Sequence, residues 1–265
     1  MKKQINFFFL LIIITSIISG DALGFTFNNN QEARFNDPKI KIYIADHACD
    51  TIDKTPGELA NLASKAASLY WNTVNTSSLH LNVVGIKTLS DAFKTEGVCD
   101  VIFEGGGCQI NQNMLASDGI VISCNNSSDG NGFNSSILAV SLPNNTDGSN
   151  IISGVVLLND TEDTQFNDLS EDDQIAVLAH EIGHAFGLGH SSVVNSLMYF
   201  STVDKRKTLG QDDRDAITYL YPPESNIANC ATVSTKKNNQ SILQFMAGLF
   251  IAVMLGLLWR GRKFL

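Results

Sequence analysis

The sequence predicts a mixed α/β (α+β) domain with a five-stranded, mixed, twisted sheet and three main helices, followed by a transmembrane helix near the carboxyl terminus. Three observations predict this fold class. Short apolar runs, several with a period of two, are separated by turns rich in Gly, Asn, Ser and Asp, as expected for strands. Helical apolar stripes follow capping residues. An apolar run at 242–259 is long enough to cross a bilayer.

The strands are expected where apolar residues alternate or form short continuous runs. The first is indicated by Ile40, Ile42 and Ile44, which alternate with Lys41 and Tyr43. Further strands are expected at 79–83, 101–103, 120–122, 137–140 and 155–158.

The helices are predicted from their caps. Residues 55–58 form a capping box with proline at the first helical position, and the helix behind it ends near Trp71. A second helix begins after Ser170 and runs to about Phe186. A third begins near Gln211 and ends before the prolines at 222–223.

Composition excludes two classes of protein. The chain has 265 residues, 44% of them hydrophobic and 17% charged, and this is too apolar for a disordered chain. Its net charge of −9 argues against a nucleic-acid partner, because phosphate binding requires a basic surface. The length suits one domain of roughly 150–200 residues with accessory segments.

The amino-terminal end is typical of an exported protein. Residues 1–24 combine a basic start, an apolar middle and small residues at Ala22 and Gly24, which predicts a signal peptide. An uncleaved anchor helix is the alternative. A short segment, 25–38, then leads to the folded domain at 39–221.

The carboxyl-terminal end of the sequence predicts a membrane-spanning helix. A polar linker at 222–240 precedes a helix at 241–260, which ends at the interfacial residue Trp259 and a basic tail at 261–265. A buried core helix is one alternative, and a sorting signal that is cut off later is another. The domain is therefore expected on the outer face of a membrane, extracellular or periplasmic, or secreted after carboxyl-terminal processing.

Five cysteines in an exported chain predict disulfides. Two bridges with one cysteine left over allow fifteen pairings. Cys99, Cys108 and Cys124 are close in sequence, so one bridge is expected among them, and Cys230 in the linker is expected to stay unpaired. The chain has no CxxC motif, which argues against a thiolate metal site.

The segment 180–190, HEIGHAFGLGH, carries the chemistry. His180 and His184 are four residues apart and lie on one face of a helix, where two imidazoles reach one zinc ion. Gly187 permits a left-handed turn that returns His190 as the third ligand. Glu181 lies beside the open fourth position and can act as general base. His47 and His80 have no such spacing and are expected to be ordinary histidines.

The sequence resembles the matrixin branch of the metzincin zinc peptidases. HExxHxxGxxH at 180–190 is followed by Ser196-Leu197-Met198-Tyr199, where matrixins have a methionine turn, and by Leu209-x-Gln211-Asp212-Asp213 at the start of a last helix. Upstream, 137–139 is similar to the edge strand of the matrixin cleft. The resemblance covers about 39–221 and is strongest from Ala176 onward.

The resemblance implies a metzincin-like fold and a zinc metalloendopeptidase. It implies His180, His184 and His190 as ligands of one catalytic zinc, with Glu181 as general base and Met198 as the floor beneath the metal. Asp212 and Asp213 would tie the last helix to the methionine turn and to the mature amino terminus. Their alternative role is that of solvated carboxylates at a helix amino terminus.

Several positions depart from the family pattern. Val140 or Ser141, and Leu157, stand where the family has ligands of a structural zinc, so no second zinc is expected. A further candidate is a calcium site at Asn159 and Glu162, with backbone oxygens from 128–132, because hard cations bind clustered oxygens. In the family, a proline and a tyrosine usually form the outer wall of the S1′ pocket. Phe200 and Thr202 stand at these positions here, so the family's preference for substrate side chains in this pocket cannot be transferred to this chain. A cysteine-switch propeptide and a haemopexin-like domain are not expected.

Two hypotheses of function follow. The first is a secreted or membrane-tethered zinc metalloendopeptidase that hydrolyses peptide bonds of extracytoplasmic proteins with a zinc-activated water. Its partners would be protein or peptide substrates, and the membrane through the carboxyl-terminal helix. The second is a zinc-containing extracellular binding or adhesion module without turnover. Glu181 favours the enzyme, because a module without turnover needs no base; another metzincin branch would keep the chemistry and change the cleft.

Overall fold

A computed structural model describes residues 24–28, 31–104, 107–201 and 207–223 of the chain. The predicted signal peptide, Cys230, the carboxyl-terminal helix and its basic tail lie outside these residues, as does nearly all of the linker. Two compact units are distinguished, Met1–Glu224 and Ser225–Leu265, and the description below concerns the first. In the described ranges, no helix combines the length and the apolar character that a membrane crossing requires.

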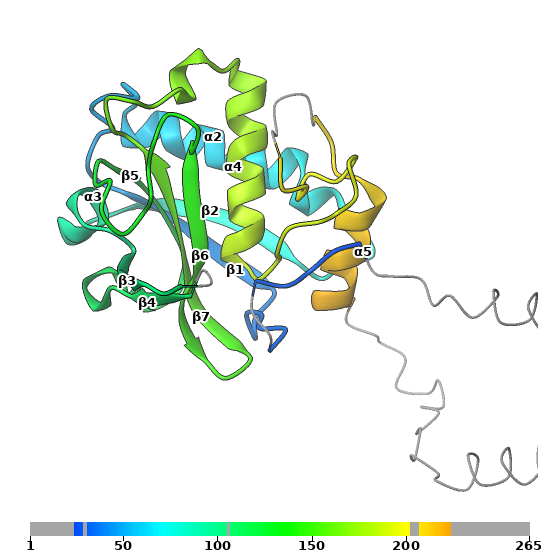
Figure 1. The fold of residues 1–265 in the computed structure, drawn as a ribbon. Coiled ribbons are helices and arrows are strands. Elements are labelled where there is room, and N and C mark those ends of the chain that lie inside the picture. The colour runs from blue at the N-terminus through cyan, green and yellow to red at the C-terminus, as the bar shows by residue number, and fades with distance from the viewer. Residues whose placement is uncertain (1–23, 29–30, 105–106, 202–206, 224–265) are drawn as a thin grey trace, which may run out of the picture. The chain divides into compact units, whose positions relative to one another are not determined.

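The core of the fold is a five-stranded sheet with the strand order β2-β1-β5-β7-β6 (Figure 1). Its first four strands are parallel, and only β6 runs antiparallel, along β7. This confirms the predicted five-stranded mixed sheet. The strands are β1 (Lys39–Ala45), β2 (His80–Lys87), β5 (Gly119–Asn125), β6 (Ala139–Asp147) and β7 (Asn150–Asn159).

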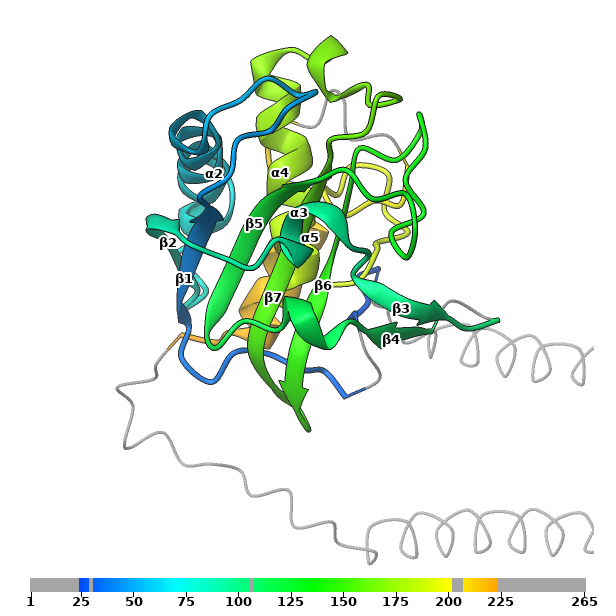
Figure 2. The same cartoon turned by 90° about the vertical axis from the view of Figure 1, so that its left-hand side faces the viewer.

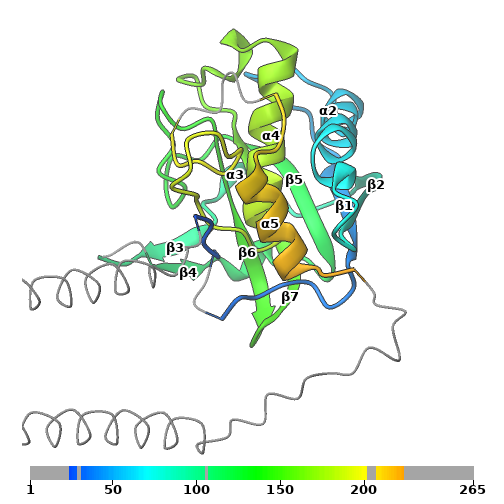
Figure 3. The same cartoon turned by 90° about the vertical axis from the view of Figure 1, so that its right-hand side faces the viewer.

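Three helices cover one face of this sheet (Figure 3). They are α2 (Pro56–Leu69), α4 (Glu171–Ala185) and α5 (Gln211–Leu220). Thr55 caps α2 through the predicted capping box, and Ser170 caps α4 by accepting a hydrogen bond from the backbone N–H of Asp173. The predicted helices are confirmed, with α2 ending two residues before Trp71.

The opposite face carries smaller elements that the sequence did not predict in full (Figure 2). Helix α3 (Ala92–Thr95) lies over β5, and a hairpin of β3 (Cys99–Ile102) and β4 (Cys108–Ile110) lies beside β6 (Figure 2). The strand expected at 101–103 therefore belongs to this hairpin and not to the main sheet. Disulfides join Cys99 to Cys108 and Cys49 to Cys124, which confirms one bridge among the three neighbouring cysteines.

The edge strand β6 differs from its prediction. It begins at Ala139, not at residue 137, and continues to Asp147, well past the predicted end at 140. Pro143 lies inside it, and the register is irregular around Asn145. An edge strand tolerates a proline because one side of it needs no hydrogen-bonding partner in the sheet.

The domain also begins earlier than residue 39. Phe25, Ala33 and Phe35 are buried in the main apolar core. The backbone of Arg34 exchanges hydrogen bonds with Ser149 and Ile151, next to the start of β7. The segment 24–38 is thus part of the folded unit.

Candidate metal centre and substrate cleft

Helix α4 and the turn behind it bring three histidines together. His180 and His184 are buried on the last turns of the helix. The helix ends at Ala185, and Gly187, two residues further on, has a φ of 121°, a conformation that residues with a Cβ rarely adopt. The chain then doubles back, so that His190 faces the two helical imidazoles.

The three Nε2 atoms face one another. Nε2 of His184 lies 3.1 Å from Nε2 of His180 and 3.2 Å from Nε2 of His190. Nδ1 of His180 is 2.7 Å from the carbonyl oxygen of Leu197, and Nδ1 of His184 is 2.8 Å from that of Leu188. A carbonyl only accepts hydrogen bonds, so each Nδ1 carries the proton and leaves its Nε2 with a free lone pair.

Burial disfavours the charged forms of two of the three histidines. Burial and the neighbouring His180 hold the pKa of His184 well below its ordinary value, and burial also lowers the pKa of His190. Neutral imidazole is the form that binds metal. In the described part of the chain, these are the only three His, Cys, Asp or Glu side chains gathered closely enough to hold one ion.

Glu181 lies beside this cluster and contacts the edge strand. Its Oε2 accepts a hydrogen bond of 2.6 Å from the hydroxyl of Ser141 on β6. Burial raises the pKa of Glu181 to about 7, and the Ser141 hydroxyl acts in the opposite direction by stabilising the carboxylate. Sequence reasoning missed this role of Ser141, because the two residues are forty positions apart.

Replacing Ser141 with alanine is expected to lower kcat for peptide hydrolysis about tenfold, because hydrogen bonds to charged groups contribute roughly 1.5–3 kcal/mol. Without the hydroxyl, the pKa of Glu181 rises. Since the ionised carboxylate is the active form, the acidic limb of the pH–rate profile should move to higher pH. Steady-state kinetics from pH 5 to pH 8 measure both effects. Ser141→Thr is the control, because it keeps a hydroxyl and should retain most of the activity. If the pH–rate profile of Ser141→Ala is the same as that of the wild type, Ser141 does not tune the pKa of Glu181.

Met198 packs against α4 at Gly183. A Cβ on Gly183 would come within 2.5 Å of the Met198 Sδ atom and 2.9 Å of the Trp71 ring. Gly183 is therefore required by the close approach of these two side chains. The sequence analysis singled out Met198 but not the glycine that makes room for it.

Asp213 and Asp212 lie at the start of α5 and have different surroundings. The fully buried carboxylate of Asp213 accepts hydrogen bonds from the backbone N–H groups of Leu197, Met198 and Gly210, and from Ser196 Oγ. Burial raises the pKa of Asp213, and these four donors oppose the rise. Asp212 accepts from Ser191 Oγ at 2.6 Å, and a Cβ on Gly24 would lie 2.6 Å from its Oδ1.

A strap formed by residues 24–28 runs beside the loop that carries His190. The Thr26 hydroxyl donates to the carbonyl of His190 at 2.7 Å, and the Thr26 carbonyl accepts from Gly189 N–H at 2.8 Å. The Asn28 side chain donates to the carbonyl of His184 at 3.1 Å. The strap thus bonds to the backbone of two of the three histidines.

A chain that begins at residue 39 is expected to be less stable than one that begins at residue 24 by at least about 3 kcal/mol, because burial of Phe25 and Phe35 contributes roughly 1.5–3 kcal/mol each. Urea unfolding of chains 24–223 and 39–223 measures the difference. A chain 31–223 retains Phe35 and lacks only the strap, so it should lose zinc more readily than 24–223 with a smaller loss of stability. If all three chains are equally stable and retain zinc equally well, residues 24–38 stabilise neither the fold nor the zinc site.

A cleft of about 600 Å³ opens beside the histidines. The start of β6 and the residues before it form one wall, and Tyr199, Phe200 and Ser201 form the other. Phe200 is exposed, and its ring lies 4.4 Å from that of Tyr199, measured between centroids. Thr202 lies outside the described residues.

The residues named for calcium are not gathered in one cavity. The Asn159 amide donates to the carbonyls of Asn134 and Ile137, and its oxygen accepts from the backbone and side chain of Thr161. Glu162 lines a separate polar cavity of about 590 Å³ together with Asp50 and Asp160. Calcium binding at Asn159 and Glu162 stays a prediction.

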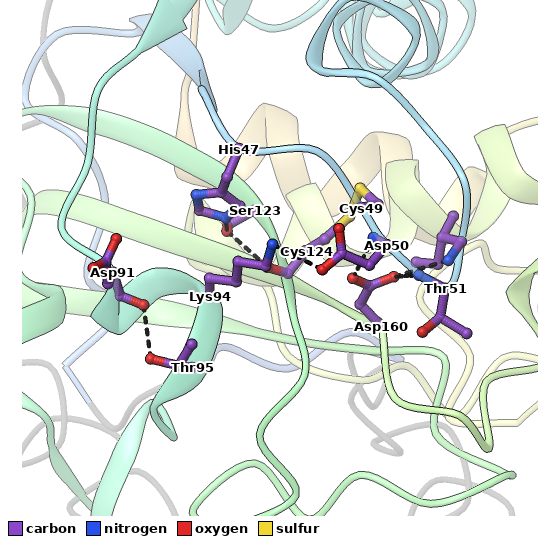
Figure 4. A network of polar contacts seen from close by, with 11 residues as sticks. His47, Cys49, Asp50, Thr51, Asp91, Lys94, Thr95, Ser123, Cys124 and Asp160 are labelled. Atoms are coloured by element: carbon purple, nitrogen blue, oxygen red, sulfur yellow. Dashed lines mark hydrogen bonds and ion pairs between the residues drawn. A yellow bond between two sulfur atoms is a disulfide. The ribbon is translucent and has the colours of Figure 1, made fainter.

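The carboxylate of Asp160 has a structural role in that region (Figure 4). It accepts hydrogen bonds from the backbone N–H groups of Asp50, Thr51 and Ile52. The disulfide between Cys49 and Cys124 joins the same loop to β5. These contacts hold the loop that follows β1 against the sheet.

Comparisons with known proteins agree with this geometry. The matrixin family model matches residues 114–222. The chain is 44% identical to Metalloendoproteinase 2-MMP of Arabidopsis thaliana over 75 residues, which is 27% of this chain and 20% of the relative. It is 43% identical to Matrix metalloproteinase-25 of Mus musculus over 81 residues, 28% of this chain and 13% of the relative.

A third relative is Stromelysin-1 of Rattus norvegicus, which is 37% identical over 84 residues, 30% of this chain and 18% of the relative. The matched region thus spans a fifth or less of the length of these relatives. The matched residues 114–222 contain the three histidines, Glu181 and Met198. This part of the chain is therefore similar in sequence to the matrixin family of peptidases.

Proposed function

We propose that the chain is a zinc metalloendopeptidase that hydrolyses peptide bonds of extracytoplasmic proteins. The observation that carries the proposal is the convergence of three Nε2 atoms beside the Glu181 carboxylate. Matrixin membership of residues 114–222 supports the same chemistry.

The donor set fits zinc. Two nitrogens bound to one tetrahedral ion at about 2.0–2.1 Å would lie roughly 3.3 Å apart, close to the observed 3.1 and 3.2 Å. Two lone pairs facing each other at this separation repel unless a cation lies between them. When bound, zinc supplies Lewis-acid activation of a water and charge stabilisation at the scissile carbonyl.

Glu181 performs the proton transfers. As a carboxylate, it accepts the proton of the attacking water and returns it to the leaving amine. A cation at the three imidazoles lowers the pKa of Glu181 below the value of about 7 that burial gives it. The base is then ionised at neutral pH. Ser141 holds Oε2, so that Oε1 is left for the proton.

The substrate is an extended peptide segment. One edge of β6 is unpaired in the five-stranded sheet, and the start of this strand lines the cleft beside Glu181. A peptide added as a further strand would gain backbone hydrogen bonds there and present its scissile bond to the base. Residues on either side of that bond can then enter the cleft.

The proposed location is outside the cytoplasm. Two disulfides in the described residues support an oxidising compartment. The signal peptide at 1–24 and the helix at 241–260 would export the domain and either hold it at the outer face of a membrane or be processed to release it. These two segments rest on the sequence alone.

A peptide-library digest tests the proposed function. The zinc-loaded protein should cleave internal peptide bonds, lose this activity with a chelator and regain it with added zinc. If the zinc-loaded protein leaves a broad library intact, the proposal fails, and a zinc-containing binding module takes its place.

A further inference from the structure

The far end of the cleft carries an acidic group that the proposed chemistry does not use. From His180 and Glu181, the cleft runs past Val177 and Leu169 to Gln165 and Asp168. Asp168 and Glu181 are the only carboxylates among the described residues that line it, and no lysine or arginine is among those residues. Since Glu181 acts on the water, Asp168 sets the charge at the far end.

Asp168 lies on a rigid element. It ends the 3-10 turn Phe166–Asp168, and the Phe166 side chain is fully buried. The Gln174 amide on α4 donates to the carbonyl of Phe166 at 3.1 Å, and the Asn167 amide donates to the carbonyl of Thr51 at 2.9 Å. The backbone that carries Asp168 is therefore held from both sides, so binding a ligand would order little additional chain.

The carboxylate of Asp168 is exposed and has no counter-ion among the described residues. Two other acids close by in sequence differ in this respect, because Glu171 pairs with Lys65 and Asp173 pairs with Lys207. Within the described ranges, a cation that enters the cleft thus displaces no partner of this carboxylate.

Between the base and Asp168, the cleft wall is apolar. Leu169 and Val177 line this stretch. A lysine or arginine side chain has the matching form, with an aliphatic stem that packs on apolar surface and a cationic end that pairs with a carboxylate. An acidic side chain in the same place would meet the like charge of Asp168.

We propose that Asp168 is a specificity-determining residue that selects peptides with lysine or arginine within three residues of the scissile bond. This inference rests on the proposed function and names its substrate class.

Matched peptides test it on the zinc-loaded full-length protein. Each set of peptides carries Lys, Arg, norleucine or Glu at one of the three positions on either side of the cleaved bond, and kcat/KM is measured for each peptide. At one of these positions, the basic peptides should be cleaved at least tenfold faster than the norleucine peptide, and the Glu peptide slowest. Asp168→Asn should remove the preference for basic residues, so that the basic peptides and the norleucine peptide are cleaved at similar rates.

Asp172→Asn is the matched control, because it removes the same charge from an exposed position that does not line the cleft. It should keep the preference. Asp168→Lys should favour the Glu peptide over the Lys peptide. A wild type without preference for basic residues, or a preference that survives Asp168→Asn, overturns this inference and leaves the peptidase proposal standing. A wild type that cleaves no peptide overturns both.

Discussion

Replacing Glu181 with glutamine is expected to lower kcat/KM for peptide hydrolysis by roughly 10²–10⁴-fold, the usual contribution of a positioned general base. Glutamine has the shape of glutamate and can still accept the hydrogen bond from Ser141. It cannot take a proton from the attacking water. Because Glu181 is not one of the three converging imidazoles, zinc content and the unfolding midpoint should stay close to those of the wild type.

Single-turnover kinetics with a peptide cleaved by the wild type, together with metal analysis, measure both parts of this result. Glu162→Gln is the control, since Glu162 is exposed and lies outside the catalytic cleft. It should change neither rate nor zinc content. A Glu181→Gln protein that binds zinc and cleaves as fast as the wild type would remove the proposed base from the mechanism.

Asp213→Ala is expected to destabilise the domain by about 3–5 kcal/mol, because it leaves buried hydrogen-bond donors without an acceptor. Three of these donors are backbone N–H groups, of Leu197, Met198 and Gly210. The carbonyl of Leu197 also accepts from Nδ1 of His180. Loss of Asp213 should therefore loosen His180, one of the three proposed zinc ligands, as well as the fold.

Urea unfolding of the zinc-loaded variants measures this effect. Asp215→Ala is the matched control on the same helix, since Asp215 is exposed and its carboxylate accepts a hydrogen bond from the side-chain amide of Gln211, one helical turn away. A change within about 0.5 kcal/mol is expected there. If the two variants unfold at the same urea concentration, Asp213 does not hold the methionine turn.

Local patterns predicted the elements that local interactions stabilise. Thr55 and Ser170 cap the helices that begin beside them, as their side-chain hydrogen bonds show. The buried strands β5 and β7 were found from short apolar runs, although both are longer than predicted. Helix α3 and strand β4 were missed because four and three residues are too few to show a period.

The edge strand β6 was placed only in part, and for a physical reason. Its second half contains Pro143, Asn144 and Asn145, which are rare inside sheets and indicate a loop in a sequence. Asp147 and Gly148 are a hairpin signal that could have located its end.

Long-range contacts account for the rest of what sequence reasoning missed at the site. The histidines and Glu181 lie in one short motif, so their proximity follows from helix geometry and one glycine turn. Ser141 and Thr26 reach the site from positions 40 and 164 residues away. No periodicity or spacing links residues across such distances. The tertiary fold alone brings them together.

Titration of zinc into the metal-free chain 24–223, with peptide cleavage as the readout, tests the central claim most directly. Activity should be absent without metal, rise in proportion to added zinc and reach its plateau at one ion per chain, because the three converging imidazoles form one site. A plateau at two ions per chain, or zinc that binds without any cleavage appearing, would contradict the account.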